Sequence, residues 1–221
     1  MIPTRIDDAT REGYVQNIIS AWHRATPEQV ARGRAWYPTA HGLATVIADG
    51  ETRKGAGVIA ALSANKSWSL NCRLARGALR SGRASGHVRD ALCKAERIML
   101  GEDPEDVLPM GLKTGNFFRC IADPSDLDAV VIDRHAHDIA VGDTYGTRDR
   151  GLTNPNRYAL LAQVYREAAH RLGELPATVQ SVTWVAHTER LASTSTRGPI
   201  EPVEIDGVTF YAPPSREEDS S

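Results

Sequence analysis

The spacing of the apolar residues limits what this chain can fold into more than any other feature. Between Asn156 and Leu172 they recur every three or four positions, which places Tyr158, Leu161 and Tyr165 on one face of a helix. The same spacing marks several further segments: Arg11–Arg24, Gln29–Tyr37, His41–Ala48, Gly57–Leu79 (two helices joined by a turn), His87–Leu100 and a stretch that opens at Pro176. The sequence therefore predicts a mainly α protein.

Local signals set the ends of these elements. Thr26–Glu28 is a typical helix start, because a hydroxyl can cap the helix, a proline fits its first turn and an acid favours its dipole. Pro38 predicts a break, because proline has no backbone N–H to donate inside a helix. Near the C-terminus, Val203–Tyr211 predicts a small β-hairpin that turns at Asp206. We expect the polar end of the chain beyond it to be disordered.

Composition argues against several classes of protein. With 221 residues, 41% of them hydrophobic and 24% charged, the chain is similar to soluble globular proteins. No run approaches the roughly 18 apolar residues that span a bilayer, and the N-terminus lacks the apolar stretch of a signal peptide. Cys72, Cys93 and Cys120 suit neither a disulfide framework nor a cysteine-rich metal site. We therefore expect a cytoplasmic monomer without a membrane partner, with one helical domain over residues 1–190 and an irregular extension over 191–221.

Positive charge gathers in one part of a chain whose formal net charge is −2. From residue 53 to residue 97 there are ten basic residues and two acidic ones. Within this segment Arg73, Arg76 and Arg80 are spaced to form one stripe along a helix, which suits contacts to successive phosphates of a nucleic acid. The alternative is an ordinary solvated helix face, and the charges alone are consistent with both.

The most informative stretch begins at Leu108 with the residues L-P-M-G-L-K-T-G-N-F-F. It is followed, from Ala129, by the apolar run A-V-V-I and then by D-R-H-A-H. These segments resemble the hairpin L-P-G-V-G-x-K-T-A-N and the later V-D-T-H motif of the helix-hairpin-helix DNA glycosylases, the superfamily of endonuclease III and 8-oxoguanine glycosylase. Lys113 lies at the position of that family's nucleophilic lysine. Asp133, twenty residues later, lies at the position of its catalytic aspartate.

A third segment agrees with this family in order and position. Ala61–Trp68, followed by Asn71, is similar to the family's L-S-A-Q-x-T-D-x-x-V-N segment, whose polar side chain enters the duplex near the extruded base. The resemblance covers about two-fifths of the chain, from Gly57 to Gly142. It implies a two-lobed helical fold with a helix-hairpin-helix motif and a cleft between the lobes, and it implies double-stranded DNA as the partner.

The activity that the resemblance implies is base excision by a DNA glycosylase, with or without a β-lyase step. An enzyme that acts on a base must take it out of the stack. An amine made nucleophilic by burial or by cationic neighbours can attack the sugar C1′ and form a Schiff base, and a nearby carboxylate can stabilise the developing positive charge. Lys113 and Asp133 are the candidates for these roles. The alternatives are a solvated phosphate-contact lysine and a helix N-cap, and an aspartate can be both a cap and catalytic.

The other candidate site residues would contact DNA. A hairpin of small residues lets backbone N–H groups approach a phosphate, and the helix that follows adds the positive end of its dipole. Hydroxyl and amide side chains can add hydrogen bonds to phosphate, and a tryptophan can stack on a base or simply pack in the core. These candidates are Asn65, Lys66, Trp68, Arg73, Arg76, Arg80, Gly111, Thr114, Asn116 and His135.

Asp133, His135 and His137 raise the question of a metal site. In a strand the three side chains would share one face, whereas at the start of a helix His135 points away from the other two. The resemblance predicts the helix, so we expect no transition-metal site. It also implies no iron–sulfur cluster, because the four-cysteine loop of the endonuclease III branch is absent. A sodium or potassium ion at the hairpin carbonyls is compatible with the resemblance.

The family's motif is altered at two places. Counted back from Lys113, Pro109 stands where the first hairpin glycine falls, which removes one backbone N–H from phosphate binding. The alternative is a hairpin one residue shorter, in which Pro109 matches the family's proline. Arg134 replaces the threonine after the aspartate. Two rival functions therefore stay open. One is an enzyme on the same scaffold that modifies DNA bases rather than excising them. The other is a DNA-binding protein that kept the fold and lost the chemistry.

Overall fold

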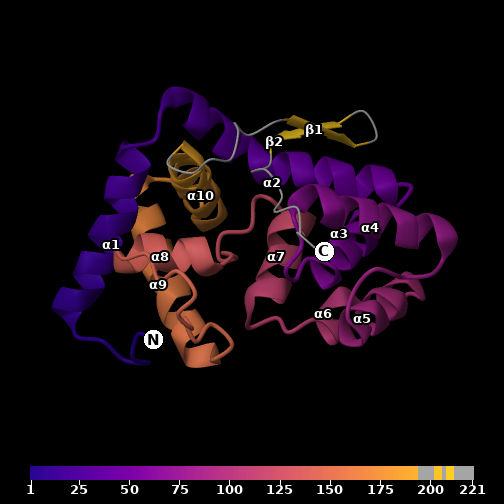
Figure 1. Cartoon of the computed structure of the whole chain (residues 1–221), viewed down its shortest axis with the longest axis horizontal. Helices are drawn as coiled ribbons and strands as arrows, with labels where there is room; N and C mark the ends of the chain where they lie inside the picture. The colour runs from indigo at the N-terminus through magenta and orange to yellow at the C-terminus, as the bar shows by residue number, and fades with distance from the viewer. Residues whose placement is uncertain (194–201, 206–207, 212–221) are drawn as a thin grey trace, which may run out of the picture.

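Ten helices and one pair of short strands make up residues 1–193, 202–205 and 208–211, which are the residues that the computed structural model describes (Figure 1). The helices are α1 (Asp8–His23), α2 (Pro27–Ile47), α3 (Thr52–Ala61), α4 (Trp68–Ser81), α5 (Arg89–Met99), α6 (Pro104–Val107), α7 (Lys113–Ala122), α8 (Arg134–Val141), α9 (Pro155–Leu172) and α10 (Pro176–Ser193). The chain is mainly α, as the apolar spacing predicts.

The two strands, β1 (Pro202–Ile205) and β2 (Val208–Tyr211), pair in antiparallel orientation, with Val203 opposite Phe210. The turn predicted at Asp206 and the expected disordered end of the chain lie outside the described residues. None of the helices in the described ranges is both long and apolar enough to span a membrane.

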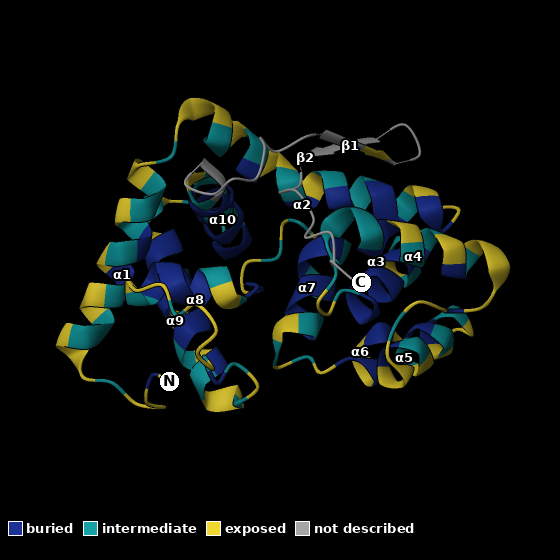
Figure 2. Cartoon of the chain, in the orientation of Figure 1, coloured by how far each residue is buried: buried dark blue, intermediate teal, exposed yellow. Residues whose placement is uncertain are grey.

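Two separate hydrophobic cores organise the helices. The first core consists of buried side chains between Tyr37 and Val131 together with Ala177, and it is built mainly by α2 to α7. The second core joins Ile2 and α1 to Ile132 and to the helices α8 to α10. Figure 1 shows α1, α8, α9 and α10 on one side and α3 to α7 on the other. Figure 2 shows that the buried faces of each group turn inward.

The break predicted at Pro38 is wrong, because helix α2 continues through this residue. The helix runs from Pro27 to Ile47 without ending at the proline, so the segments on either side form one element. Pro38 lies on the exposed face, where water can bond the carbonyl of Arg34 that loses its helical partner. Burial of the opposite face, which carries Tyr37 and Leu43, outweighs this single lost hydrogen bond.

Close contacts at glycines tie α2 to both halves of the molecule. A Cβ atom at Gly33 would lie 2.5 Å from the Cα of Val182 in α10. A Cβ atom at Gly55 in α3 would lie 2.8 Å from the carbonyl carbon of Ala44. Both distances are shorter than van der Waals contact, so these helices approach each other only because glycine has no side chain. Helix α2 therefore holds α10 in one half and α3 in the other.

Candidate functional site

Asp133 begins helix α8 at the point where the chain passes from the first core to the second. Val131 belongs to the first core and Ile132 to the second. The Asp133 Oδ1 accepts hydrogen bonds from the backbone N–H groups of His135 (2.9 Å) and Ala136 (2.8 Å). Its Oδ2 accepts none from the described residues, and the side chain is partly exposed. Asp133 is thus a helix N-cap with one carboxylate oxygen left for a ligand.

Two buried side chains hold the extended segment that leads to Asp133. The Tyr158 hydroxyl donates to the carbonyl of Val130 (3.0 Å) and accepts from the N–H of Ile132 (3.0 Å). Burial raises the pKa of this hydroxyl, which keeps it protonated as a donor. The Oδ1 of Asn116 accepts from the N–H of Val130 (3.4 Å). The segment is extended but belongs to no sheet, and these side chains replace the ladder that a neighbouring strand would supply.

Asn116 has an internal role in place of the predicted phosphate contact. It is 5% exposed, and its Nδ2 donates to the carbonyls of Met110 (3.3 Å) and Leu112 (3.0 Å). Because its Oδ1 is engaged by Val130, every polar atom of the side chain has a partner inside the protein. These internal hydrogen bonds weigh against the predicted phosphate contact. Asn116 instead joins the turn before α7 to the segment before Asp133.

The turn between α6 and α7 spans both cores and presents Lys113. Met110 packs against the first core and Leu112 against the second. Lys113 follows as the first residue of α7, with an exposed side chain that has no ion-pair or hydrogen-bond partner among the described residues. No side chain caps this helix, so the N–H groups of its first turn are open to an acceptor. Gly111 is exposed and Thr114 partly exposed beside them.

The close packing of this turn requires a glycine at Gly115 but not at Gly111, whose backbone N–H is the predicted phosphate contact. A Cβ at Gly115 would overlap the Cα of Met110 and lie 2.7 Å from the carbonyl oxygen of Pro109. A Cβ at Gly111 would meet nothing within 4 Å. We expect Gly115→Ala to destabilise the protein by about 1–3 kcal/mol, and Gly111→Ala to change stability by less than about 0.5 kcal/mol. Urea unfolding of both variants measures the difference. Equal losses would show that the turn adjusts to a Cβ.

A row of aromatic side chains connects α4 to the start of α8. The ring of Trp68 lies 4.9 Å from that of Trp36 and 6.1 Å from that of Phe117, between centroids. Trp36 lies 6.4 Å from Trp184 of α10, which lies 6.3 Å from His135. Trp68 is therefore packed among other rings, and its position favours the packing alternative over stacking on a base.

His135 and His187 form a pair of imidazoles near Asp133. Their ring centroids are 5.5 Å apart. Arg134 donates to Nε2 of His135 (3.0 Å), and Arg190 donates to Nδ1 of His187 (3.3 Å). Burial lowers the pKa of both rings, and that of His187 falls to about 4 with the help of His135 and Arg190. Both rings are therefore neutral near pH 7.

His187 does not stand out in the sequence, because it is a single histidine on a helix of otherwise ordinary composition. The available signal is its spacing from Trp184. Residues three apart share a helix face, so Trp184 and His187 of α10 face the same neighbour. Which neighbour that is follows only from the packing of α10 on α8.

A buried ion pair joins Asp138 of α8 to Arg150 in the loop that follows this helix. Arg150 donates to both oxygens of Asp138, at 2.8 Å from Nε and 2.7 Å from Nη2. Nδ1 of His137 lies 2.9 Å from the same carboxylate. The helix start predicted at Asp133 is confirmed, and it turns His135 and His137 to different neighbours. In the described part of the chain, no three His, Cys, Asp or Glu side chains are grouped to hold a metal ion.

The predicted arginine stripe lies on α4, away from Asp133. Arg73 and Arg80 are exposed and Arg76 is partly exposed. Elsewhere in the basic segment, ion pairs to acidic side chains reduce the charge: Arg53 with Asp103, Lys94 with Asp90, and Arg97 with Glu102.

The loop between α3 and α4 carries Asn65 and Lys66 at the edge of the first half. Asn65 is exposed and has a φ of 56°, a left-handed conformation that asparagine tolerates better than most residues. Lys66 is partly exposed. Helix α4 packs on α3 and near β1, and the row of aromatic rings is what connects this region to His135.

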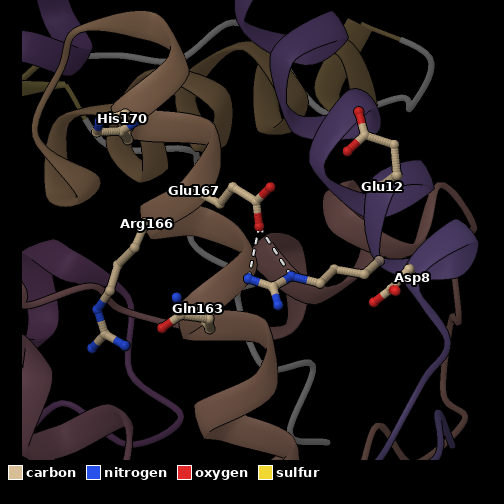
Figure 3. Close-up of a pocket in the computed structure, with 7 residues that line it drawn as sticks. Asp8, Glu12, Gln163, Arg166, Glu167 and His170 are labelled. Atoms are coloured by element: carbon tan, nitrogen blue, oxygen red, sulfur yellow. Dashed lines mark hydrogen bonds and ion pairs between the residues drawn. The ribbon is translucent and has the colours of Figure 1, made fainter.

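A surface groove between α1 and α9 contains none of the predicted site residues (Figure 3). Arg11 and Glu167 form an ion pair of 2.8 Å across it, and the remaining lining is of mixed charge. The groove is lined by Asp8, Arg11, Glu12, Gln163, Arg166, Glu167 and His170. Glu12 and Arg166 also form ion pairs, with Arg171 and Asp128, so most of the charged groups in the groove already have a partner.

Residues 1–191 match a protein family described as a family of unknown function, DUF7178, and the chain belongs to this family. No curated protein and no solved structure matches the chain. Its function therefore has to be argued from its own residues.

Proposed function

We propose that this member of the DUF7178 family is a base-excision DNA glycosylase with a β-lyase step, in which Asp133 and Lys113 are the catalytic residues. The proposal depends on one observation above all. Asp133 is fixed by its own helix cap at the crossing between the two cores, yet its Oδ2 stays free. A carboxylate held rigidly with one open oxygen suits the stabilisation of a positive charge that develops on a ligand.

The proposed reaction takes place at C1′ of a nucleotide. Nζ of Lys113 bonds to C1′ and loses a proton, while the C1′–N bond breaks and the base leaves with the electron pair and takes up a proton. Opening of the C1′–O4′ bond then gives a Schiff base between the lysine and the sugar. The Oδ2 of Asp133 faces the partial positive charge on C1′ during the first step. In the β-lyase step the Schiff base loses a C2′ proton to water, and the 3′-phosphate leaves with the electron pair of the C3′–O bond. Water then hydrolyses the remaining Schiff base and restores the amine.

Support for DNA as the partner comes from the turn before α7. Its uncapped N–H groups, the exposed Gly111 and the hydroxyl of Thr114 form a surface that suits a phosphate. In this proposal α6, the turn and α7 serve as the helix-hairpin-helix motif, and the two cores serve as the two lobes. Asn116 already donates to the turn carbonyls of Met110 and Leu112, so the proposal includes no cation at that place.

Borohydride trapping on duplex DNA tests the catalytic role of Lys113. A panel of duplexes carries an abasic site, each mismatch or a damaged base, and reduction converts a Schiff base into a stable adduct. We expect the wild type to form the adduct on at least one duplex, and Lys113→Ala to lose it by about 100-fold or more. Lys94→Ala is the matched control, because Lys94 pairs with Asp90 on α5. No adduct with the wild type, or an undiminished adduct with Lys113→Ala, would contradict the lyase step.

The two rival functions leave different products. Mass spectrometry of the nucleosides after incubation finds a free base if the enzyme excises it, and an altered nucleoside if the enzyme modifies it. A binding protein without chemistry leaves the DNA unchanged, and its affinity survives the loss of both Lys113 and Asp133.

A further inference from the structure

His187 is a buried hydrogen-bond donor without an acceptor. It is 8% exposed and lies on α10, in the part of the chain that the glycosylase resemblance does not cover. Arginine can only donate, so the bond from Arg190 makes Nδ1 of His187 an acceptor and leaves the proton of the neutral ring on Nε2. That Nε2 is buried and has no partner within the described ranges. Buried donors are nearly always paired, so an unpaired one calls for an explanation.

The surroundings of His187 indicate what the missing acceptor belongs to. The ring of His135, which also contacts Trp184, lies beside it, and His135 follows Asp133 by two residues. Because Nε2 of His135 accepts from Arg134, its proton is on Nδ1, which makes it a second neutral donor. The group therefore contains two neutral N–H donors, an aromatic ring and one open carboxylate oxygen. This set matches a planar heterocycle with hydrogen-bond acceptors better than it matches an anion.

We propose that His187 is a specificity-determining residue, whose Nε2–H donates to a carbonyl oxygen or ring nitrogen of a nucleobase held beside Asp133. The inference rests on the proposed function, since that function brings a base to Asp133. The inference goes beyond that function because it assigns a residue of α10 to base selection. In this inference the partly exposed ring of His135, 5.5 Å from that of His187, turns aside for the base, which then lies against Trp184.

NMR of the histidine side chains tests this inference without any catalytic step. Protein with ¹⁵N-labelled imidazoles is titrated with the free bases adenine, cytosine, thymine and uracil, and separately with inorganic phosphate. We expect at least one base to shift the Nε2 resonance of His187, which is assigned from its absence in His187→Gln. We expect His187→Phe to weaken the binding of that base about tenfold, as the loss of one hydrogen bond implies. His187→Gln keeps an N–H donor and should stay within about threefold of the wild type.

His170→Phe is the matched control, because His170 is an exposed histidine on α9 at the groove of Figure 3. Its base affinity should equal that of the wild type. A shift of His187 with phosphate but with no base would make this an anion site and overturn the proposal, and so would the absence of any shift. If His187→Phe fails to fold, the wild-type titration and His187→Gln still decide.

Failure of this inference can be told apart from failure of the proposed function. If Lys113 forms an adduct on DNA but no base shifts the Nε2 resonance of His187, the proposed glycosylase stands and the role of His187 is wrong. If a base shifts the Nε2 resonance of His187 but no duplex gives an adduct, the base site stands and the lyase chemistry is wrong.

Discussion

Replacing Asp133 by asparagine is expected to slow base release by at least about 100-fold while the fold stays intact. Asparagine caps a helix as well as aspartate does, so the N–H groups of His135 and Ala136 keep their acceptor. It carries no charge, so it cannot stabilise a cation at C1′. Base release is measured on the duplex that gives the Lys113 adduct, and thermal unfolding checks the fold.

Asp7→Asn provides the matched control for this variant. Asp7 caps α1 by accepting from the N–H of Thr10 (2.7 Å), and it is exposed on the outside of the second half. Base release by Asp7→Asn should equal that of the wild type. Undiminished release by Asp133→Asn would reduce Asp133 to a helix cap.

Replacing Arg150 by methionine is expected to lower the free energy of unfolding by about 3–5 kcal/mol. The side chains of Arg150 and Asp138 are 12% and 4% exposed, so the change leaves a buried carboxylate without its counterion. Arg148→Met is the control, because Arg148 and Asp143 are 58% and 57% exposed. It should cost no more than about 1 kcal/mol, even with the loss of its contact over the Tyr145 ring. Urea unfolding measures both variants, and equal losses would show that the buried pair contributes nothing special.

The effect of Arg150→Met should depend on pH. Burial raises the pKa of Asp138, but the hydrogen bonds from Arg150 and His137 together outweigh it and bring the pKa below its usual 3.8. A carboxyl with a lowered pKa stabilises the fold at pH values above 3.8, and this stabilisation is lost as the pH falls through the lowered pKa. The stability gap between wild type and variant should therefore be full near pH 7 and narrow in acid. A gap that widens below pH 4 would contradict this.

The helices could be predicted wherever local signals and packing agree. The apolar spacing of Asn156–Leu172 predicts α9 to within one residue, and the observed caps agree with it: Pro155 begins the helix and Gly173 ends it in a left-handed conformation. Pro38 shows the opposite case. The local rule for proline is correct about the lost hydrogen bond, but the burial of the opposite face of α2 decides the outcome, and burial depends on helices that are distant in the sequence.

The candidate site divides in the same way. Asp133 could be predicted as a helix cap, because an aspartate before a helical segment is a local signal. Asn116 could not be placed, since an amide suits a phosphate as well as a backbone carbonyl, and only the packing of the turn shows which one it bonds. His187 could not be selected as a site residue, because its proposed role depends on contact with the ring of His135 on another helix.

The order in which the chain visits its two cores has a consequence for synthesis. Apart from Ala177, the first core is made of residues 37–131, which leave the ribosome as one continuous piece. The second core joins Ile2 and α1 to residues 130–179, so α1 leaves the ribosome well before the residues it packs against. The residues that meet in the second core are far apart in the sequence, and contacts between distant residues form late in folding. We therefore expect the first core to form before α8 and α10 are available, and the surroundings of Asp133 to assemble only after α10 has left the ribosome.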